Sequence, residues 1–347
     1  MNITADNHFL PQAYLKNWSA DGTRVWMYRT LVSHARVPEW ELRPARGLGL
    51  QRHLYTSVSS GAESDSFERW IADTIETPAA SALKKAVSGR PLTSDDWKRL
   101  TLYVAALDQR TPTSYLEHMA RWERDTPAVM QRVMKRVERE LRRAGGQQRL
   151  LRAPTPDPPR HHPLPLRVHV DRRITESQSA VKAELTLGRE LWLHTMHHLL
   201  TNTAHVLNEH QWGIAHPAPG LEWFTSDHPV LRLNFNSDQE YDFQGGWGSR
   251  GTEILIPLSP THMMFTQVGK SVPDEFTFTE QQTRTLQRFL AERAHRSVFA
   301  ARPIRRVAWF HPRRVDANAF AAERRAWELW HTEHSAVAGD ATEGHGS

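Results

Sequence analysis

Two apolar runs lie in Glu253-Ile-Leu-Ile-Pro-Leu-Ser-Pro-Thr-His-Met-Met-Phe-Thr-Gln-Val268, on either side of a turn that contains serine and proline. Glu253–Ile256 and His262–Val268 have the length and composition of buried or half-buried strands. Val230–Leu233 has the same character, and Arg24–Thr30 predicts a further strand near the start of the chain. We therefore predict a small, mostly antiparallel sheet that combines strands of the N-terminal region with strands of the C-terminal half.

Helical periodicity dominates the rest of the chain. Apolar residues recur at spacings of three and four over Phe67–Ala86, and a second helix is expected from about Ser94 to Leu107. Thr111-Pro112 predicts an N-cap followed by proline at the first helical position of a long charged helix that ends near Ala144. Because helices and strands are grouped along the chain and do not alternate, an α+β fold, rich in helix, is the expected class. Three further helices are expected. They run from about Ser177 to Asn208, from a Thr279–Gln282 capping box through Val298, and from about Asn318 to His331. A last strand is expected at Arg305–Phe310.

Proline and glycine divide the chain. Gly145-Gly146 and six prolines between Pro154 and Pro165 predict that residues 145–173 form a Pro- and Arg-rich mobile linker or insertion. We expect residues 1–144 to form an N-terminal strand plus helical region, and residues 174–335 to form a helix plus strand-rich region that completes the same fold. The polar residues 336–347 are expected to be a disordered tail.

Composition sets limits on the class of protein. The chain has 347 residues, 39% of them apolar and 24% charged, which is typical of a globular protein. It contains no cysteine, which excludes disulfides, thiolate metal sites and cysteine nucleophiles and favours the cytoplasm. No apolar run approaches eighteen residues, so no membrane partner is expected, and the first residues do not predict a secretion signal.

The positive charge is concentrated in one segment. The formal net charge is only +5, but residues 121–173 contain 14 basic and six acidic side chains. This segment is either a surface that binds an anionic ligand or a nucleic acid, or a solvated helix face that leads into a loop. The sequence does not decide between them, and it does not indicate an oligomeric state.

Twenty histidines raise the question of a metal site. On an uninterrupted helix, His194, His198 and His205 would lie on one face, as metal ligands do, although a chain this rich in histidine produces such spacing by chance. The sequence permits a divalent metal but does not require one, and it identifies no cofactor. It contains no Gly-x-Ser-x-Gly elbow, phosphate-binding Walker loop, dinucleotide-binding glycine motif or calcium loop.

Two short clusters bring unlike polar residues together. His8, Gln12 and Tyr14 lie within Asn7–Leu15, and Ser226, Asp227 and His228 lie within Thr225–Pro229, which follows a strand-like segment. A loop at a strand end can direct an aspartate and a histidine into a pocket. The structural alternatives are a buried histidine bonded to a backbone carbonyl at His8, and a turn in which Asp227 accepts backbone N–H bonds.

With these clusters, the chain resembles the bacterial family called domain of unknown function 4238. The family opens with a His-x-x-Pro-x-x-Tyr-Leu phrase, which matches His8 to Leu15 here. The resemblance covers about residues 7–302 and implies a set of polar residues without assigning an activity. Further matching phrases are Phe67-Glu68, Ile75-Glu76, Gln109-Arg110-Thr111-Pro112, Thr225–Pro229 and Pro257-Leu258-Ser259-Pro260.

These residues suggest two functions. The first is an intracellular hydrolase-like enzyme for a phosphate-bearing substrate, with nucleic acid among the candidates, in which His8 is the acid or base, Arg110 binds the anion and Asp227 orients His8 or holds a metal. The substrate-binding residues would then be Gln12, Tyr14, Gln109, Ser226 and His228. The second is a non-catalytic binding protein, in which Arg110 pairs with Glu68 or Glu76 in a structural network and residues 121–173 bind the ligand or partner. Catalysis requires His8, Arg110 and Asp227 to converge on one cleft.

Overall fold

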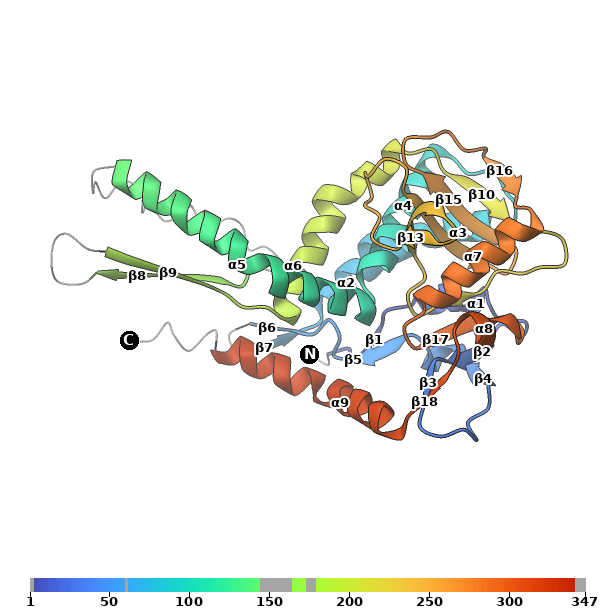
Figure 1. The fold of residues 1–347 in the computed structure, drawn as a ribbon, viewed down its shortest axis with the longest axis horizontal. Helices are drawn as coiled ribbons and strands as arrows, with labels where there is room; N and C mark the ends of the chain where they lie inside the picture. Colours follow the sequence, from blue (N-terminus) through green and yellow to red (C-terminus); the bar gives the residue numbers. More distant parts are fainter. Residues whose placement is uncertain (1–2, 60–61, 144–163, 173–178, 341–347) are drawn as a thin grey trace.

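The computed structural model describes residues 3–59, 62–143, 164–172 and 179–340, and the fold is α+β (Figure 1). Its largest sheet has six strands in the order β13-β12-β14-β15-β10-β16. Two strands form its central hairpin, β14 (Glu253–Ser259) and β15 (His262–Gln267), whose residues are almost all buried. The sheet is antiparallel except where β10 and β16 pair in parallel. On one side of the hairpin lie β12 (Leu231–Ser237) and the edge strand β13 (Glu240–Asp242). On the other side lie β10 (Gly213–His216) and the edge strand β16 (Glu275–Thr277).

A second, four-stranded sheet joins the two ends of the chain. Strand β2 (Arg24–Arg29) lies between β4 (Trp40–Pro44) and β17 (Ser297–Ala300), and β11 (Thr225–Ser226) pairs with the far edge of β17. The predicted combination of N-terminal strands with strands of the C-terminal half is therefore confirmed in this four-stranded sheet. The six-stranded sheet is separate from it. Three small ladders pair β1 (Asp6–His8) with β5 (Leu50–Arg52), β3 (Leu31–Val32) with β18 (Arg314–Val315), and β6 (Ser57–Ser59) with β7 (Ala62–Ser64).

One long helical segment contains a π turn. Helices α2 (Ser66–Ile71) and α3 (Thr77–Ala86) are joined through Ala72–Glu76, which has the wider π-helical geometry. A π turn accommodates about one more residue per turn than an α-helix and so changes which side chains share a face. Helix α4 (Ser94–Gln109) follows and begins with a Thr93–Asp96 capping box, and its second half is almost entirely buried.

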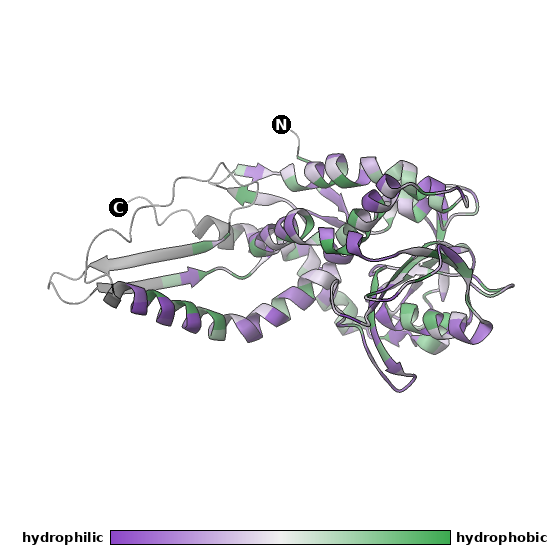
Figure 2. Ribbon diagram, turned by 90° about the horizontal axis from the view of Figure 1, so that it is seen from above, coloured by the Kyte–Doolittle hydropathy of each residue, from purple (hydrophilic) through white to green (hydrophobic). Residues whose placement is uncertain are grey.

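Helix α5 (Pro112–Arg143) begins where the Thr111-Pro112 pattern predicts, and the Ser114 N–H donates to Thr111 Oγ1 at 3.1 Å. Its outer half projects from the body of the protein beside the hairpin of β8 (Leu166–Arg172) and β9 (Ser179–Leu185) (Figure 1). Hydrophilic and hydrophobic residues alternate along α5, as expected of an amphipathic helix (Figure 2).

The hairpin falls within two predicted segments. Residues 166–172, at the end of the expected linker or insertion, pair as a strand, because the prolines end at Pro165 and every later residue of the strand can donate its N–H. The expected helix from Ser177 begins only at Arg189, after Gly188, whose φ of +152° favours glycine. Of the other residues in the expected segment, 145–163 and 173 lie outside the described residues, and 164–165 lead into β8.

The C-terminal part is mostly helical. Helix α6 (Arg189–His198) continues into a π turn at Leu199–Thr203 and a 3₁₀ segment at Ala204–Glu209, and α7 (Glu280–Arg293) begins with the expected Thr279–Gln282 capping box. The strand expected at residues 305–310 is instead helix α8 (Arg306–Phe310), because Val307 is buried while Trp309, two residues later, is exposed, so the chain does not alternate as a half-buried strand would. Helix α9 (Ala317–Asp340) runs past Ala336, and residues 341–347 lie outside the described residues. The remaining short elements are α1 (Gln12–Lys16) and a 3₁₀ turn at Ala45–Gly47.

One contiguous hydrophobic core extends from Phe9 to Trp330 and connects both sheets to α4. No helix in the described part of the chain combines the length and the apolar content needed to cross a membrane.

Candidate functional site

Arg110 lies at the end of α4 and is 1% exposed. Its Nη1 donates to the Glu76 carboxylate, its Nη2 donates to the backbone carbonyl of His8, and its Nε lies 3.4 Å from the Tyr55 hydroxyl. The Tyr55 hydroxyl in turn donates to the carbonyl of Arg110. All three guanidinium nitrogens are thus used within the protein, where they connect β1, the π turn and α4.

Glu68 and Glu76 place two carboxylates beside this one cation. Burial raises the pKa of Glu68 to about 7, Arg110 opposes the rise and Glu76 adds to it. Glu68 Oε2 is buried and makes no hydrogen bond within the described part of the protein. The π turn between the two glutamates brings them toward the same face of the helix. The Glu68 carboxyl is therefore close to half-protonated at neutral pH.

Glu68→Gln should make the protein more stable at pH 8 and leave its stability at pH 4, below the unfolded-state pKa, nearly unchanged. The raised pKa means that the folded state holds the Glu68 proton more tightly than the unfolded chain, whose glutamate pKa is about 4.5. Stability from this group is therefore present at low pH and is lost as the pH rises toward 7. Urea unfolding at both pH values should show a gain of about 1–2 kcal/mol at pH 8 for the variant. An equal effect at the two pH values would show that the Glu68 carboxyl does not titrate in this range.

His8, Gln12 and Tyr14 lie around β1 and α1. His8 Nε2 is 3.2 Å from the Arg46 carbonyl and 3.3 Å from Gln12 Nε2. The buried Tyr14 hydroxyl lies 2.6 Å from both Thr225 Oγ1 and the Pro257 carbonyl, so it links α1 to both sheets. Burial raises the pKa of Tyr14, which keeps its hydroxyl protonated and able to donate.

Asp227 binds the backbone that connects α7 to β17. Oδ1 accepts from the N–H of His295 at 2.8 Å, and Oδ2 accepts from the N–H groups of Arg296 and Ser297 at 2.7 and 2.9 Å. Burial raises the pKa of Asp227 to about 6, and the three N–H donors oppose that rise. Both oxygens are therefore committed to the main chain. Ser226 closes the same turn by bonding to the backbone of His228.

His228 is buried between two helices. Its Nε2 accepts from Arg293 Nη2 at 2.9 Å, because a guanidinium can only donate. Its Nδ1 therefore carries the proton and donates to Thr111 Oγ1 at 3.2 Å. Burial, with Arg293 as the nearest cation, lowers the pKa of His228 far below its usual value, so the ring is neutral.

The residues singled out from the sequence thus fall into two networks. His8, Gln12, Glu68, Glu76 and Arg110 belong to one network. Asp227 and His228 belong to the other, and the hydrogen bonds and ion pairs of the described residues do not join Asp227 to His8 or Arg110. Among the described residues, the two networks come together where Arg110 precedes Thr111 in the chain and where the Tyr14 hydroxyl bonds to Thr225.

A cavity of about 1180 Å³ lies beside the second network. It is bounded by the start of α5, the π turn after α6, strand β12, the segment from Tyr241 to Gly248 and the last turn of α7. Gln109 reaches it from α4, and Arg293, the partner of His228, lines its wall. Of the residues predicted as a site, Gln109 lines this cavity.

Among the described residues, four arginines and two acidic residues, Glu117 and Asp242, line the cavity, while Asp108 in its floor and Asp125 on α5 pair with Arg232 and Arg124. Arg293 is 12% exposed and forms a two-point ion pair with Glu117, while its buried Nε makes no hydrogen bond to the described residues. The other three arginines are Arg121, Arg124 and Arg232.

A chain of polar contacts fixes the cavity floor. The buried Asp108 accepts from Gln109 Nε2 at 2.7 Å and from Trp247 Nε1 at 2.9 Å, and it lies 3.2 Å from Arg232 Nε. Gln109 Oε1 accepts from the Nε2 of His118 at 3.0 Å. His118 is in turn bound by Arg121.

The state of His118 follows from these contacts. Arg121 Nη2 donates to its Nδ1 at 2.7 Å, so the proton lies on Nε2. Burial, together with Arg121 and Arg232, lowers the pKa of His118 to about 3. The ring is therefore neutral, and it connects Arg121 to the floor.

Sequence reasoning missed several cavity residues. Arg232 could have been noticed, because it interrupts the apolar strand Val230–Leu233, and Arg121 begins the basic segment. His118, Trp247 and Arg293 carry no local signal. His205 also lines the cavity, but His194, His198 and His205 do not form a three-ligand group in the described part of the chain, because the π turn at Leu199–Thr203 interrupts the helix between them.

A family model described as a protein of unknown function, DUF4238, matches residues 6–303. No curated protein and no solved structure matches the chain. The matched range contains the Arg110 network and every residue of the cavity, and it ends before α9. Because the match covers most of the chain, the protein belongs to the DUF4238 family.

Proposed function

We propose that the protein binds a phosphate-bearing small molecule in the cavity between α5, α7 and β12. The observation that carries the proposal is the meeting of four arginines from three separate elements at one concave site. Arginine presents a planar set of donors that matches phosphate oxygens and stays charged at every physiological pH. A phosphate there would accept from the guanidinium nitrogens of Arg121 and Arg293, which now contact His118 and Glu117.

The rest of the lining suits an organic portion of the ligand. Phe243, Trp247, Leu199 and Val206 supply apolar and aromatic surface, and pockets for small molecules commonly combine such surface with a few fixed polar groups. The fixed groups here are Gln109 and His118, whose hydrogen bonds to Asp108 and Arg121 hold them in place. A nucleoside monophosphate has both kinds of surface and a suitable size.

The geometry supports binding more than hydrolysis. A general base works best with a pKa near the operating pH, whereas burial lowers the pKa of His118 to about 3 and that of His228 far below normal. Arg110 and Asp227, the expected catalytic partners, are bonded to protein groups. We place this binding in the cytoplasm, which the absence of cysteine favours.

A nucleic acid is the second candidate ligand. The outer part of α5 continues from Arg124 with exposed basic residues at Arg132, Lys135, Arg136 and Arg139. A single strand with a phosphate in the cavity would meet these cations next, and its affinity would fall steeply with salt.

Isothermal titration with inorganic phosphate, AMP, adenosine and a short oligonucleotide tests the proposal. We expect AMP to bind more tightly than adenosine, and Arg121→Gln to weaken AMP binding about tenfold by removing one charge-assisted hydrogen bond. Arg324→Gln is the matched control, because Arg324 is an exposed arginine on α9, far from the cavity lining.

The outcomes separate the candidates. Binding of the oligonucleotide that greatly exceeds AMP binding and depends on Arg132 and Arg136 would favour the nucleic acid. Equal losses in the Arg121 and Arg324 variants, or no binding of any phosphate compound, would contradict a phosphate site in the cavity.

A further inference from the structure

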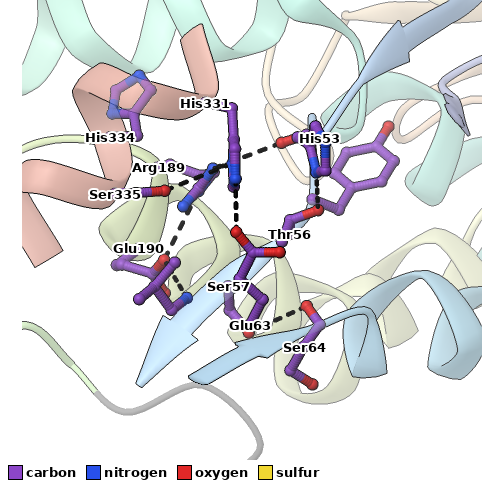
Figure 3. A network of polar contacts seen from close by, with 12 residues as sticks. His53, Thr56, Ser57, Glu63, Ser64, Arg189, Glu190, His331, His334 and Ser335 are labelled. Atoms are coloured by element: carbon purple, nitrogen blue, oxygen red, sulfur yellow. Dashed lines mark hydrogen bonds and ion pairs between the residues drawn. The ribbon is translucent and has the colours of Figure 1, made fainter. Parts of the chain in front are cut away.

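Two potential metal ligands from the segment between β5 and β7 meet a third on α9. His53 follows β5, Glu63 lies in β7 and His331 lies on α9 (Figure 3). Each residue offers one ligand atom, and these three atoms lie within 4.8 Å of one another. In the described part of the chain, no other three histidine, aspartate or glutamate residues bring their ligand atoms this close together. The group is outside the cavity lining and outside the Arg110 network.

The ligand atoms of the group are close enough to share a small cation, and His331 Nε2 is 2.7 Å from Glu63 Oε1. The imidazoles of His53 and His331 are stacked, with their centroids 3.9 Å apart and their planes at 17°. Because the lone pair of each nitrogen lies in its ring plane, one ring must rotate before both can bind the same ion. Glu63 and His331 remain 38% and 24% exposed, so an ion can reach them from solvent. Two imidazoles, one carboxylate and an open fourth position form a donor set that Zn²⁺ uses in proteins.

The backbone at His53 is held in an unfavourable conformation. Its φ is +53°, a value that no other non-glycine residue has among those described. Its N–H donates to Ala5, and its carbonyl accepts from Trp330 Nε1 at 3.1 Å, so the surrounding structure maintains the strain. Such strain costs about 1 kcal/mol or more and often occurs where a side chain is positioned for function.

The outer nitrogens of both rings have partners that can orient them. His53 Nδ1 lies 3.2 Å from Thr56 Oγ1, which can accept its proton and leave Nε2 free for a metal. His331 Nδ1 lies 3.4 Å from Ser335 Oγ and 3.3 Å from Arg189 Nη1. Without a metal, Arg189 donates to this Nδ1, so the His331 proton is on Nε2 and points to Glu63.

Arg189 must therefore change partner when a metal binds. The ring of His331 would move its proton from Nε2 to Nδ1 and donate it to Ser335, while Arg189 turns toward Glu190 Oε1, now 3.6 Å from its Nε. Besides His331, Arg189 Nη1 contacts the His53 carbonyl at 3.5 Å, and the other two guanidinium nitrogens can take up the Glu190 contact. Its Nε and Nη2 are buried and make no hydrogen bond with the described residues.

We propose that His53, Glu63 and His331 bind one divalent transition-metal ion of the zinc class. The ion ties α9 to the β6–β7 hairpin and to the segment after β5. Because His331 lies beyond the region matched by the family model, the site depends on a part of this chain that the model does not cover.

Zn²⁺ titration and Co²⁺ absorption spectroscopy test the site. We expect the intact chain to bind one equivalent that is absent from His53→Asn, Glu63→Gln and His331→Gln, and to give visible Co²⁺ bands that each variant loses. Asparagine tolerates positive φ, so the first change removes the ring without adding strain. His34→Gln is the matched control, since His34 is an exposed histidine that is not part of the group.

Thermal unfolding supplies an independent readout. Zn²⁺ should raise the midpoint of the intact chain and of the His34 variant, and it should not raise the midpoint of the three ligand variants. Midpoints without metal show whether each variant folds, and Glu63→Gln, at an exposed strand position, should remain folded.

A zinc equivalent that persists in all three ligand variants would place the metal on other histidines and overturn the proposal. The absence of any saturable equivalent in the intact chain would do the same.

Discussion

Arg110→Met is expected to lower the free energy of unfolding by about 3–5 kcal/mol, the largest loss of stability that we expect from a single substitution in this protein. The guanidinium is buried and donates to Glu76 and to the His8 carbonyl. Its removal leaves two nearby carboxylates, Glu68 and Glu76, without their cation, and it leaves the His8 carbonyl without its donor. Chemical unfolding monitored by circular dichroism measures the loss.

A second variant identifies the cause of that loss. Glu76→Gln combined with Arg110→Met removes one of the uncompensated charges, so the double variant should be more stable than Arg110→Met alone. Arg324→Met, at an exposed ion pair on α9, should change stability by less than about 0.5 kcal/mol. A loss below about 1 kcal/mol for Arg110→Met would mean that the network does not support the fold as described.

Asp227→Asn is expected to cost about 2–3 kcal/mol. Three backbone N–H groups converge on its two oxygens, and an amide can offer only one oxygen. At least one N–H of residues 295–297 would then face an NH₂ group, and a buried donor without an acceptor is costly. Aspartate and asparagine have nearly the same shape, so shape alone would predict a small effect. The larger expected loss comes from the three backbone N–H groups that bind the Asp227 carboxylate.

The measurement is again unfolding by urea, with Asp238→Asn as the control. Asp238 is exposed, and its described hydrogen bond uses its backbone carbonyl. Unchanged stability in both variants would show that the Asp227 turn does not hold the connection between α7 and β17.

Local patterns predicted most of the regular structure. The hairpin of β14 and β15, the proline start of α5 and the Thr279–Gln282 cap depend on residues that are close in sequence, where steric and hydrogen-bonding preferences act directly. The errors at α8 and β9 have a different origin. A five-residue apolar segment such as Arg306–Phe310 fits a strand or a helical turn, and only its neighbours decide between them.

The candidate site was less accessible from sequence. The polar phrases around His8, Arg110 and Asp227 do contain buried networks, but residue type alone could not show that their polar atoms bind the protein itself. The cavity is assembled from α4, α5, α7, β12 and the segment around Trp247, so no single stretch contains its pattern. The π turns also change which side chains share a face, and the helical periodicity gave no sign of them.

A crystal structure of the protein grown with AMP shows whether the arginine-lined cavity binds a phosphate-bearing molecule. We expect a phosphate group between Arg121 and Arg293, with oxygens about 3 Å from their guanidinium nitrogens. We also expect the organic part to lie against Phe243 or Trp247. AMP bound only outside the cavity, with Arg121 still on His118 and Arg293 still on Glu117 at their present distances of 2.7 and 2.6 Å, would contradict phosphate binding there.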